Sequence, residues 1–127
     1  MKRLLLDTTV VVWLLLNDRA AVSRKAVRAL SNERNAVSLS AVSVWEIAIK
    51  RSLGKLDVEA SWANALTQLD FDPLPVTAMH ARAVEQLPWH HSDPFDRLIV
   101  ANAKANSFAW LISDDEAIAK NYPRTIW

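Results

Sequence analysis

The run Leu4-Leu5-Leu6-Asp7-Thr8-Thr9 near the start of the chain is an apolar stretch that ends abruptly in a carboxylate. Three successive leucines beside a turn signal are typical of a strand that is buried on both faces of a parallel sheet. Ligands of open α/β sheets bind beyond the carboxyl ends of the strands. We therefore expect Asp7 to lie at the ligand-binding edge of such a sheet.

The rest of the chain alternates between short apolar runs and longer amphipathic segments. We expect strands at residues 3–7, 36–39, 71–76, 108–112 and 124–127, with the proline-containing third strand and the last one at edges. We expect helices at residues 10–16, 23–30, 41–53, 60–69, 78–86, 94–106 and 114–120. Strands that alternate with helices favour an α/β fold in which helices cover both faces of a parallel sheet.

The composition excludes several classes of protein and of functional site. The 127 residues are enough for a single domain with one core, which we expect to span residues 1–127. The lack of cysteine excludes disulfides and thiolate metal sites, and the single glycine, Gly54, excludes glycine-rich nucleotide loops. No apolar run reaches the roughly 18 residues of a membrane span, so we expect a cytoplasmic protein. Because the net charge is only +1, attraction to nucleic acid must be local or carried by a metal.

For both Asp7 and Glu46, a role in local structure is the alternative to a role in function. Asp7, or its neighbour Thr8, could cap the helix that follows. Glu46 lies in a helix that is apolar nearly all round, where a carboxylate is costly to bury unless it is paired or bound to a cation. Lys50, four residues on, is the local alternative to a cation as its partner.

The motif Asp93-Pro94-Phe95-Asp96 predicts the start of a helix. Asp93 suits the N-cap, and Asp96 then falls in the first turn, where a negative charge favours the helix dipole. Asp96 also shares a face with apolar residues of that helix, which directs it toward the packed side. Arg97 beside it could pair with an acid or with a phosphate.

The segment Ser113-Asp114-Asp115-Glu116 has the form of a capping box with Ser113 as the N-cap. It directly follows an apolar strand, so one of its two aspartates is expected at the same edge of the sheet as Asp7. Carboxylates gather at one edge only where something offsets their repulsion, because crowded carboxylates raise one another's pKa. Oxygen ligands alone select Mg²⁺ or Mn²⁺, either of which activates a water and stabilises charge on a phosphate.

The sequence also contains two weaker signals. His90 and His91, together with Asp93, outline a zinc site, although adjacent histidines do not easily reach one ion. Trp45 lies in an apolar helix and is expected in the core.

Four stretches together carry a resemblance that covers most of the chain. They are residues 4–8, 40–50, 93–98 and 111–115. In these stretches the chain resembles PIN-domain nucleases, and specifically VapC-type toxins of bacterial toxin–antitoxin pairs. The resemblance implies a PIN-like α/β/α sandwich with a central parallel sheet of four to five strands. It also implies endoribonuclease activity that depends on Mg²⁺ or Mn²⁺.

By this resemblance, the four acids of the family correspond to Asp7, Glu46, Asp96 and Asp115. Asp7 and Asp96 would be direct metal ligands, while Glu46 and Asp115 would act through water. Asp115 is chosen over Asp114 because the family pattern is a hydroxyl residue, any residue, and then Asp.

The resemblance extends to supporting residues and to partners. Thr8 and Ser113 match hydroxyl positions that support the acids, and Asp93 is an accessory acid. This chain has Thr9 where close relatives often have His. The implied partners are an RNA substrate, a second copy of the chain in a homodimer, and a cognate antitoxin whose tail occupies the active-site groove.

Two other functions are consistent with parts of the sequence. A phosphatase could use Asp7 as a nucleophile, but such sites often carry a second Asp two residues on, where this chain has Thr9. A non-catalytic, partner-binding PIN-like domain would have a degenerate site, whereas all four acids are present here. The sequence does not specify which RNA is cleaved, how many metal ions bind, or which surface forms a dimer.

Overall fold

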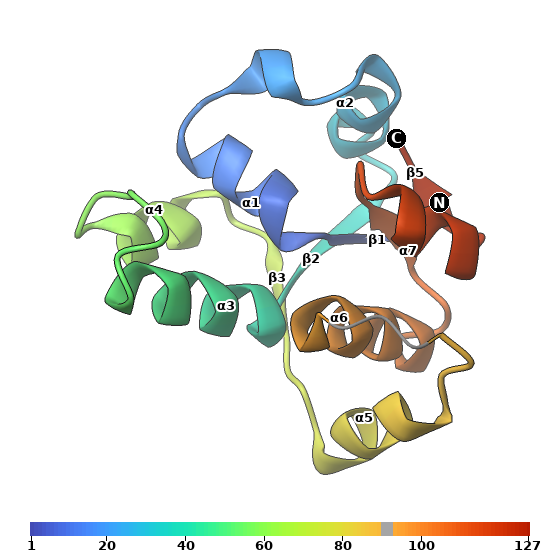
Figure 1. Ribbon diagram of the computed structural model, residues 1–127. Helices are drawn as coiled ribbons and strands as arrows, with labels where there is room; N and C mark the ends of the chain where they lie inside the picture. The colour runs from blue at the N-terminus through green and yellow to red at the C-terminus, as the bar shows by residue number, and fades with distance from the viewer. Residues whose placement is uncertain (90–92) are drawn as a thin grey trace.

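The computed structural model describes residues 1–89 and 93–127. Within them, five strands form one sheet, all of them parallel, in the order β3-β2-β1-β4-β5 (Figure 1). The strands are β1 (Arg3–Leu6), β2 (Ala36–Ser40), β3 (Asp72–Leu74), β4 (Trp110–Ile112) and β5 (Thr125–Ile126). The expected α/β fold with four to five parallel strands is therefore confirmed, and so is the placing of β3 and β5 at the two edges.

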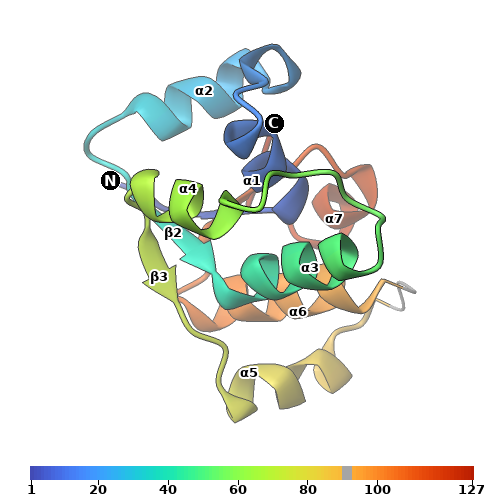
Figure 2. The same cartoon turned by 90° about the vertical axis from the view of Figure 1, so that its left-hand side faces the viewer.

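Helices connect the strands and cover the sheet (Figures 1 and 2). They are α1 (Thr8–Leu15), α2 (Arg24–Ser31), α3 (Ala41–Ser52), α4 (Trp62–Gln68), α5 (Ala78–Ala83), α6 (Pro94–Ala105) and α7 (Glu116–Asn121), with short 3₁₀ turns at Arg19–Ala21 and Val84–Gln86. The buried hydrophobic side chains form two core clusters. One cluster contains residues of α1, α2 and α4, and the other contains residues of α6 and α7. No helix in the described part of the chain combines the length and apolar character that a bilayer crossing requires.

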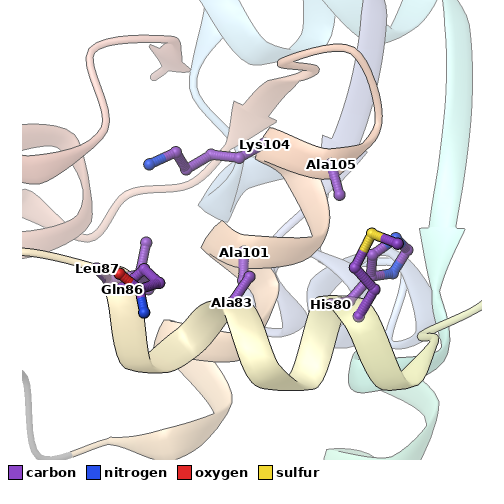
Figure 3. A pocket seen from close by; sticks show the side chains of 8 residues that line it. His80, Ala83, Gln86, Leu87, Ala101, Lys104 and Ala105 are labelled. Carbon is purple, nitrogen blue, oxygen red and sulfur yellow. The ribbon is translucent and has the colours of Figure 1, made fainter.

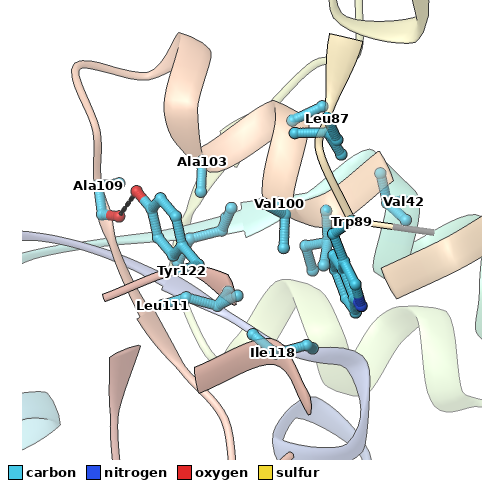
Figure 4. Close-up of a cluster of buried hydrophobic side chains, with 12 residues drawn as sticks. Val42, Leu87, Trp89, Val100, Ala103, Ala109, Leu111, Ile118 and Tyr122 are labelled. Carbon is cyan, nitrogen blue, oxygen red and sulfur yellow. Dashed lines mark hydrogen bonds between the residues drawn. The ribbon is translucent and has the colours of Figure 1, made fainter. Parts of the chain in front are cut away.

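The central strand β1 buries side chains on both faces, as its leucine run predicted. Leu4 and Leu6 belong to the core cluster that contains Val11 of α1, and Leu5 belongs to the opposite cluster. All three leucines are 0% exposed. Figure 4 shows the cluster to which Leu5 contributes, where Leu111 of β4 faces residues of α6 and α7. Alternating burial on a central parallel strand leaves the carboxyl end of β1, rather than its faces, open for chemistry.

Three local expectations need correction. Strand β4 starts at Trp110 instead of residue 108, because Phe108 has a positive φ of 53° that no strand residue adopts. The helix expected over residues 78–86 is α-helical only to Ala83 and then tightens into the 3₁₀ turn. Trp45 is 50% exposed and contacts the ring of Phe95 edge-on at 5.0 Å, so it lies outside the core.

Candidate functional site

Asp7 lies where β1 ends and α1 begins, and its side chain is only 4% exposed. Its backbone N–H donates to the carbonyl of Ile112 at 2.9 Å, which ties it to the end of β4. Its Oδ1 accepts from the N–H of Thr8 at 2.8 Å, and its Oδ2 accepts from the hydroxyl of Ser113 at 2.7 Å. Asp7 therefore caps α1 with one oxygen while the other is held against the neighbouring strand.

Ser113 is not the N-cap that the capping-box pattern predicted. Asp115 caps α7 instead, since its Oδ1 accepts from the N–H of Ala117 at 2.8 Å and of Ile118 at 3.1 Å. The hydroxyl of Ser113 is already committed: it donates to Asp7 and accepts from the N–H of Asp115 at 3.1 Å. The helix consequently starts two residues later than the sequence pattern indicated.

Glu46 is 6% exposed on α3 and forms an ion pair with Lys50 one turn further on. The local partner considered in the sequence is thus present in the structure. The same helix contributes Ser43, whose hydroxyl lies 2.9 Å from that of Thr8 in a buried contact between α3 and α1. Sequence reasoning missed Ser43, although a small polar residue three positions before Glu46 in an apolar helix was a usable signal.

Asp93 caps α6 as predicted. Its Oδ1 accepts from the N–H of Phe95 at 2.9 Å and from that of Asp96 at 3.4 Å. Asp96 is half-buried in the first turn of the helix. The Nη2 of Arg97 donates to the carbonyl of Val84 at 2.9 Å. This hydrogen bond holds the 3₁₀ turn against α6.

The charges of the four acids influence one another's pKa values. The pKa of Asp7 is raised to about 6: burial is the largest cause, the hydrogen bonds from Ser113 and Thr8 lower the pKa, and the charges of Glu46 and Asp115 raise it. Burial raises the pKa of Asp96 to about 7, followed by the charges of Asp7, Asp93, Asp115 and Glu46. Carboxylates from β1, α3, α6 and the end of β4 therefore act on one another at one edge of the sheet. Asp114, by contrast, is exposed.

This carboxylate cluster, made of Asp7, Glu46, Asp96 and Asp115, fits a hard divalent cation. Among the residues that the structure describes, no three His, Cys, Asp or Glu side chains are close enough to enclose an ion on their own. Mg²⁺ does not require such a cage, because it commonly keeps several waters and takes one or two protein carboxylates. Burial and the charges of the neighbouring acids both disfavour the ionised forms of Asp7 and Asp96, and a cation between these carboxylates would favour them.

Two other features of the surface bear on the choice of site. The zinc site considered around His90 and His91 lies outside the described residues. The hollow between α5 and α6 has a volume of about 280 Å³ and is lined by residues such as His80, Ala83 and Lys104, with none of the four acids among them (Figure 3). The carboxylate cluster therefore lies elsewhere than this cavity.

Comparisons with known proteins agree with this fold. The family model for the PIN domain matches residues 4–122. The crystal structure of VapBC2 from Rickettsia felis, bound to a DNA fragment from its promoter, contains a similar chain: the TM-score is 0.63 at 15% identity, over 97% of this chain and 95% of that one. At this identity the likeness concerns the fold. No curated protein sequence gives a significant match.

Proposed function

This chain belongs to the PIN domain family, and from that premise we propose that it is an endoribonuclease that depends on Mg²⁺ or Mn²⁺ and acts as the toxin of a toxin–antitoxin pair. The proposal rests first on the carboxylate cluster at the carboxyl end of the sheet. The single observation that carries it is the convergence of these acids at one edge of the sheet, where burial first, and then the charges of the other acids, raise the pKa of Asp7 to about 6 and that of Asp96 to about 7. Acids that only cap helices or pair on a surface have no reason to converge in this way.

We assign the direct contacts to the cation to Asp7 and Asp96, the two acids whose charged forms are least favourable in its absence. Glu46 and Asp115 act through water. When bound, the ion supplies a water of lowered pKa and stabilises charge on the scissile phosphate. The hydroxyl of Ser113 holds Asp7 in one orientation. The contact between the hydroxyls of Thr8 and Ser43 holds α1 against α3 beside the site.

The partners in this proposal are an RNA substrate, a cognate antitoxin and a second copy of the chain, all in the cytoplasm. The solved structure of VapBC2 with promoter DNA, which shares the fold, supports an assembly of this type. The motifs at residues 40–50 and 93–98, which resemble VapC-type toxins, support it independently.

The test is to replace Asp7 with Asn and to measure cleavage of cellular RNA at its mapped ends. Asp7→Asn keeps a side-chain oxygen that can cap α1, so the fold should persist while cleavage is lost. Asp57→Asn, which changes an exposed acid in the loop after α3, is the matched control and should cleave like the wild type. Full cleavage by Asp7→Asn in the presence of EDTA would end the metal mechanism.

A further inference from the structure

Lys50, in the last turn of α3, directs its half-exposed side chain toward Glu46 and the first turn of α6. Its Nζ donates to Oε2 of Glu46, the side chain of which is 8% exposed, whereas that of Lys50 is 41% exposed. The same ammonium lies over the ring of Phe95, 5.9 Å from its centroid, and Phe95 directly precedes Asp96 on α6. Lys50 therefore bridges α3 and the start of α6 at the mouth of the carboxylate cluster.

The charge of Lys50 acts on acids from both helices. Its pKa is raised first by the hydrogen bond to Glu46, against a lowering by burial, and further by the charges of Glu46, Asp93 and Asp96. The carboxylates that a divalent cation would neutralise are thus already partly neutralised by an ammonium on the chain. An ammonium and a divalent cation cannot both hold the same carboxylate oxygen at contact distance without repelling each other.

We propose that Lys50 is an internal counter-ion of the metal-free site, and that it competes with the divalent cation for Glu46. The inference rests on the metal centre of the proposed function and adds a positioning role for a residue outside the four acids. On metal binding, the ammonium leaves Glu46, whose carboxylate is then available to the water shell of the ion. The lysine stabilises the empty site and weakens metal binding through the same contact.

This double role predicts opposite effects from one substitution. A neutral residue at position 50 leaves Glu46 buried and unpaired in the metal-free protein, so the unfolding temperature in EDTA should fall. The same change removes a competing positive charge, so Mn²⁺ should bind about two- to fivefold more tightly, as expected for a half-exposed ion pair. A lysine that only supports the fold would lower stability without tightening metal binding.

The experiment measures Mn²⁺ binding by titration calorimetry and thermal unfolding in EDTA for Lys50→Met, with Lys50→Gln as a second neutral variant should the first fail to fold. Lys50→Arg keeps the positive charge and should bind Mn²⁺ within twofold of the wild type. Lys55→Met is the matched control, because Lys55 is an exposed lysine at the end of the same segment and its loss changes the net charge equally.

Tighter Mn²⁺ binding by the neutral variants, with Lys55→Met unchanged, would support the inference. Unchanged or weaker Mn²⁺ binding by Lys50→Met and Lys50→Gln would overturn the inference. The proposed metal centre would still stand in that case if the wild type binds Mn²⁺ and Asp7→Asn does not. If the wild type binds no Mn²⁺ at all, both the inference and the metal centre are overturned.

Discussion

The hydroxyl of Ser113 donates a 2.7 Å hydrogen bond to Oδ2 of Asp7, which joins two residues 106 positions apart in the chain. The bond links the ends of β1 and β4, which are neighbours in the sheet. It lowers the pKa of a buried carboxyl that would otherwise hold its proton still more firmly. Ser113 thus keeps Asp7 available as an anion near neutral pH.

Ser113→Ala should weaken Mn²⁺ binding at pH 7, because the pKa of Asp7 rises further once the hydroxyl is lost. The defect should shrink at pH 8.5, where Asp7 is ionised in both proteins. Calorimetric titration at the two pH values checks this, with the exposed Ser31→Ala as control. A defect of the same size at both pH values would mean that Ser113 acts by orientation alone. Loss of the buried hydrogen bond should also destabilise the fold by about 1–2 kcal/mol.

The metal-free protein should become less stable as the pH rises from 5 to 8. Asp7 and Asp96 have pKa values of about 6 and about 7 in the folded state, against the ordinary 3.8 of an aspartate, so the folded state holds protons that the unfolded state releases. Their favourable contribution is complete below pH 3.8 and is lost progressively as the pH rises to the folded pKa values of about 6 and about 7. For Asp7 alone the whole loss corresponds to about 3 kcal/mol, of which roughly half falls above pH 5.

Denaturant unfolding in EDTA at pH 5 and pH 8 measures this slope, and Mg²⁺ added at pH 8 should restore stability. Asp7→Asn and Asp96→Asn should each flatten the pH dependence between the two values. The same slope in wild type and in both variants would contradict a raised pKa at these positions.

Asp115→Asn should lose RNA cleavage, whereas Asp114→Asn should retain it. Asp115 is half-buried and its charge raises the pKa of both Asp7 and Asp96, while Asp114 is exposed. Because Asn is also a good N-cap, helix α7 should survive the first change, with a stability within about 1 kcal/mol of the wild type. Cleavage of labelled RNA and circular dichroism of the two variants decide between these aspartates.

Asn102→Ala should lower the free energy of unfolding by about 3 kcal/mol, because it removes the acceptor of the buried Ser40 hydroxyl together with the contacts of the amide nitrogen. Asn102 is 0% exposed: its Oδ1 accepts from the hydroxyl of Ser40 at 2.7 Å, and its Nδ2 donates to the carbonyl of Pro75 at 3.2 Å and lies 3.1 Å from Nδ1 of His80. Chemical denaturation measures the loss, and the exposed Asn64→Ala should stay close to wild type. A loss below 1 kcal/mol would mean that water replaces the amide.

Much of the site was predictable because local chemistry dictates it. Asp93 caps α6, as the motif of an N-cap aspartate followed by proline predicted. Gly54, at the end of α3, has the positive φ of 70° expected of a residue that follows a helix. The convergence of acids at the carboxyl ends of parallel strands follows from the topology that the leucine run indicated.

Other features depended on contacts between distant segments. Trp45 looked like a core residue because α3 is apolar nearly all round, and only packing selects which face is buried. Ser113 matched a capping box, yet the nearness of β1 to β4 turned its hydroxyl to Asp7 instead. Arg97 was available to an acid or a phosphate, and the position of the 3₁₀ turn gave its guanidinium a carbonyl partner.

By itself, the sequence determined the alternation of strands and helices, the burial of β1 on both faces and the set of acids, since these depend on periodicity and on residue type. Only the tertiary structure decided which partner each polar group takes. Hydrogen bonds and charge interactions depend on distances of a few ångströms between segments such as α3 and α6, and these distances arise from packing rather than from any single stretch of the chain.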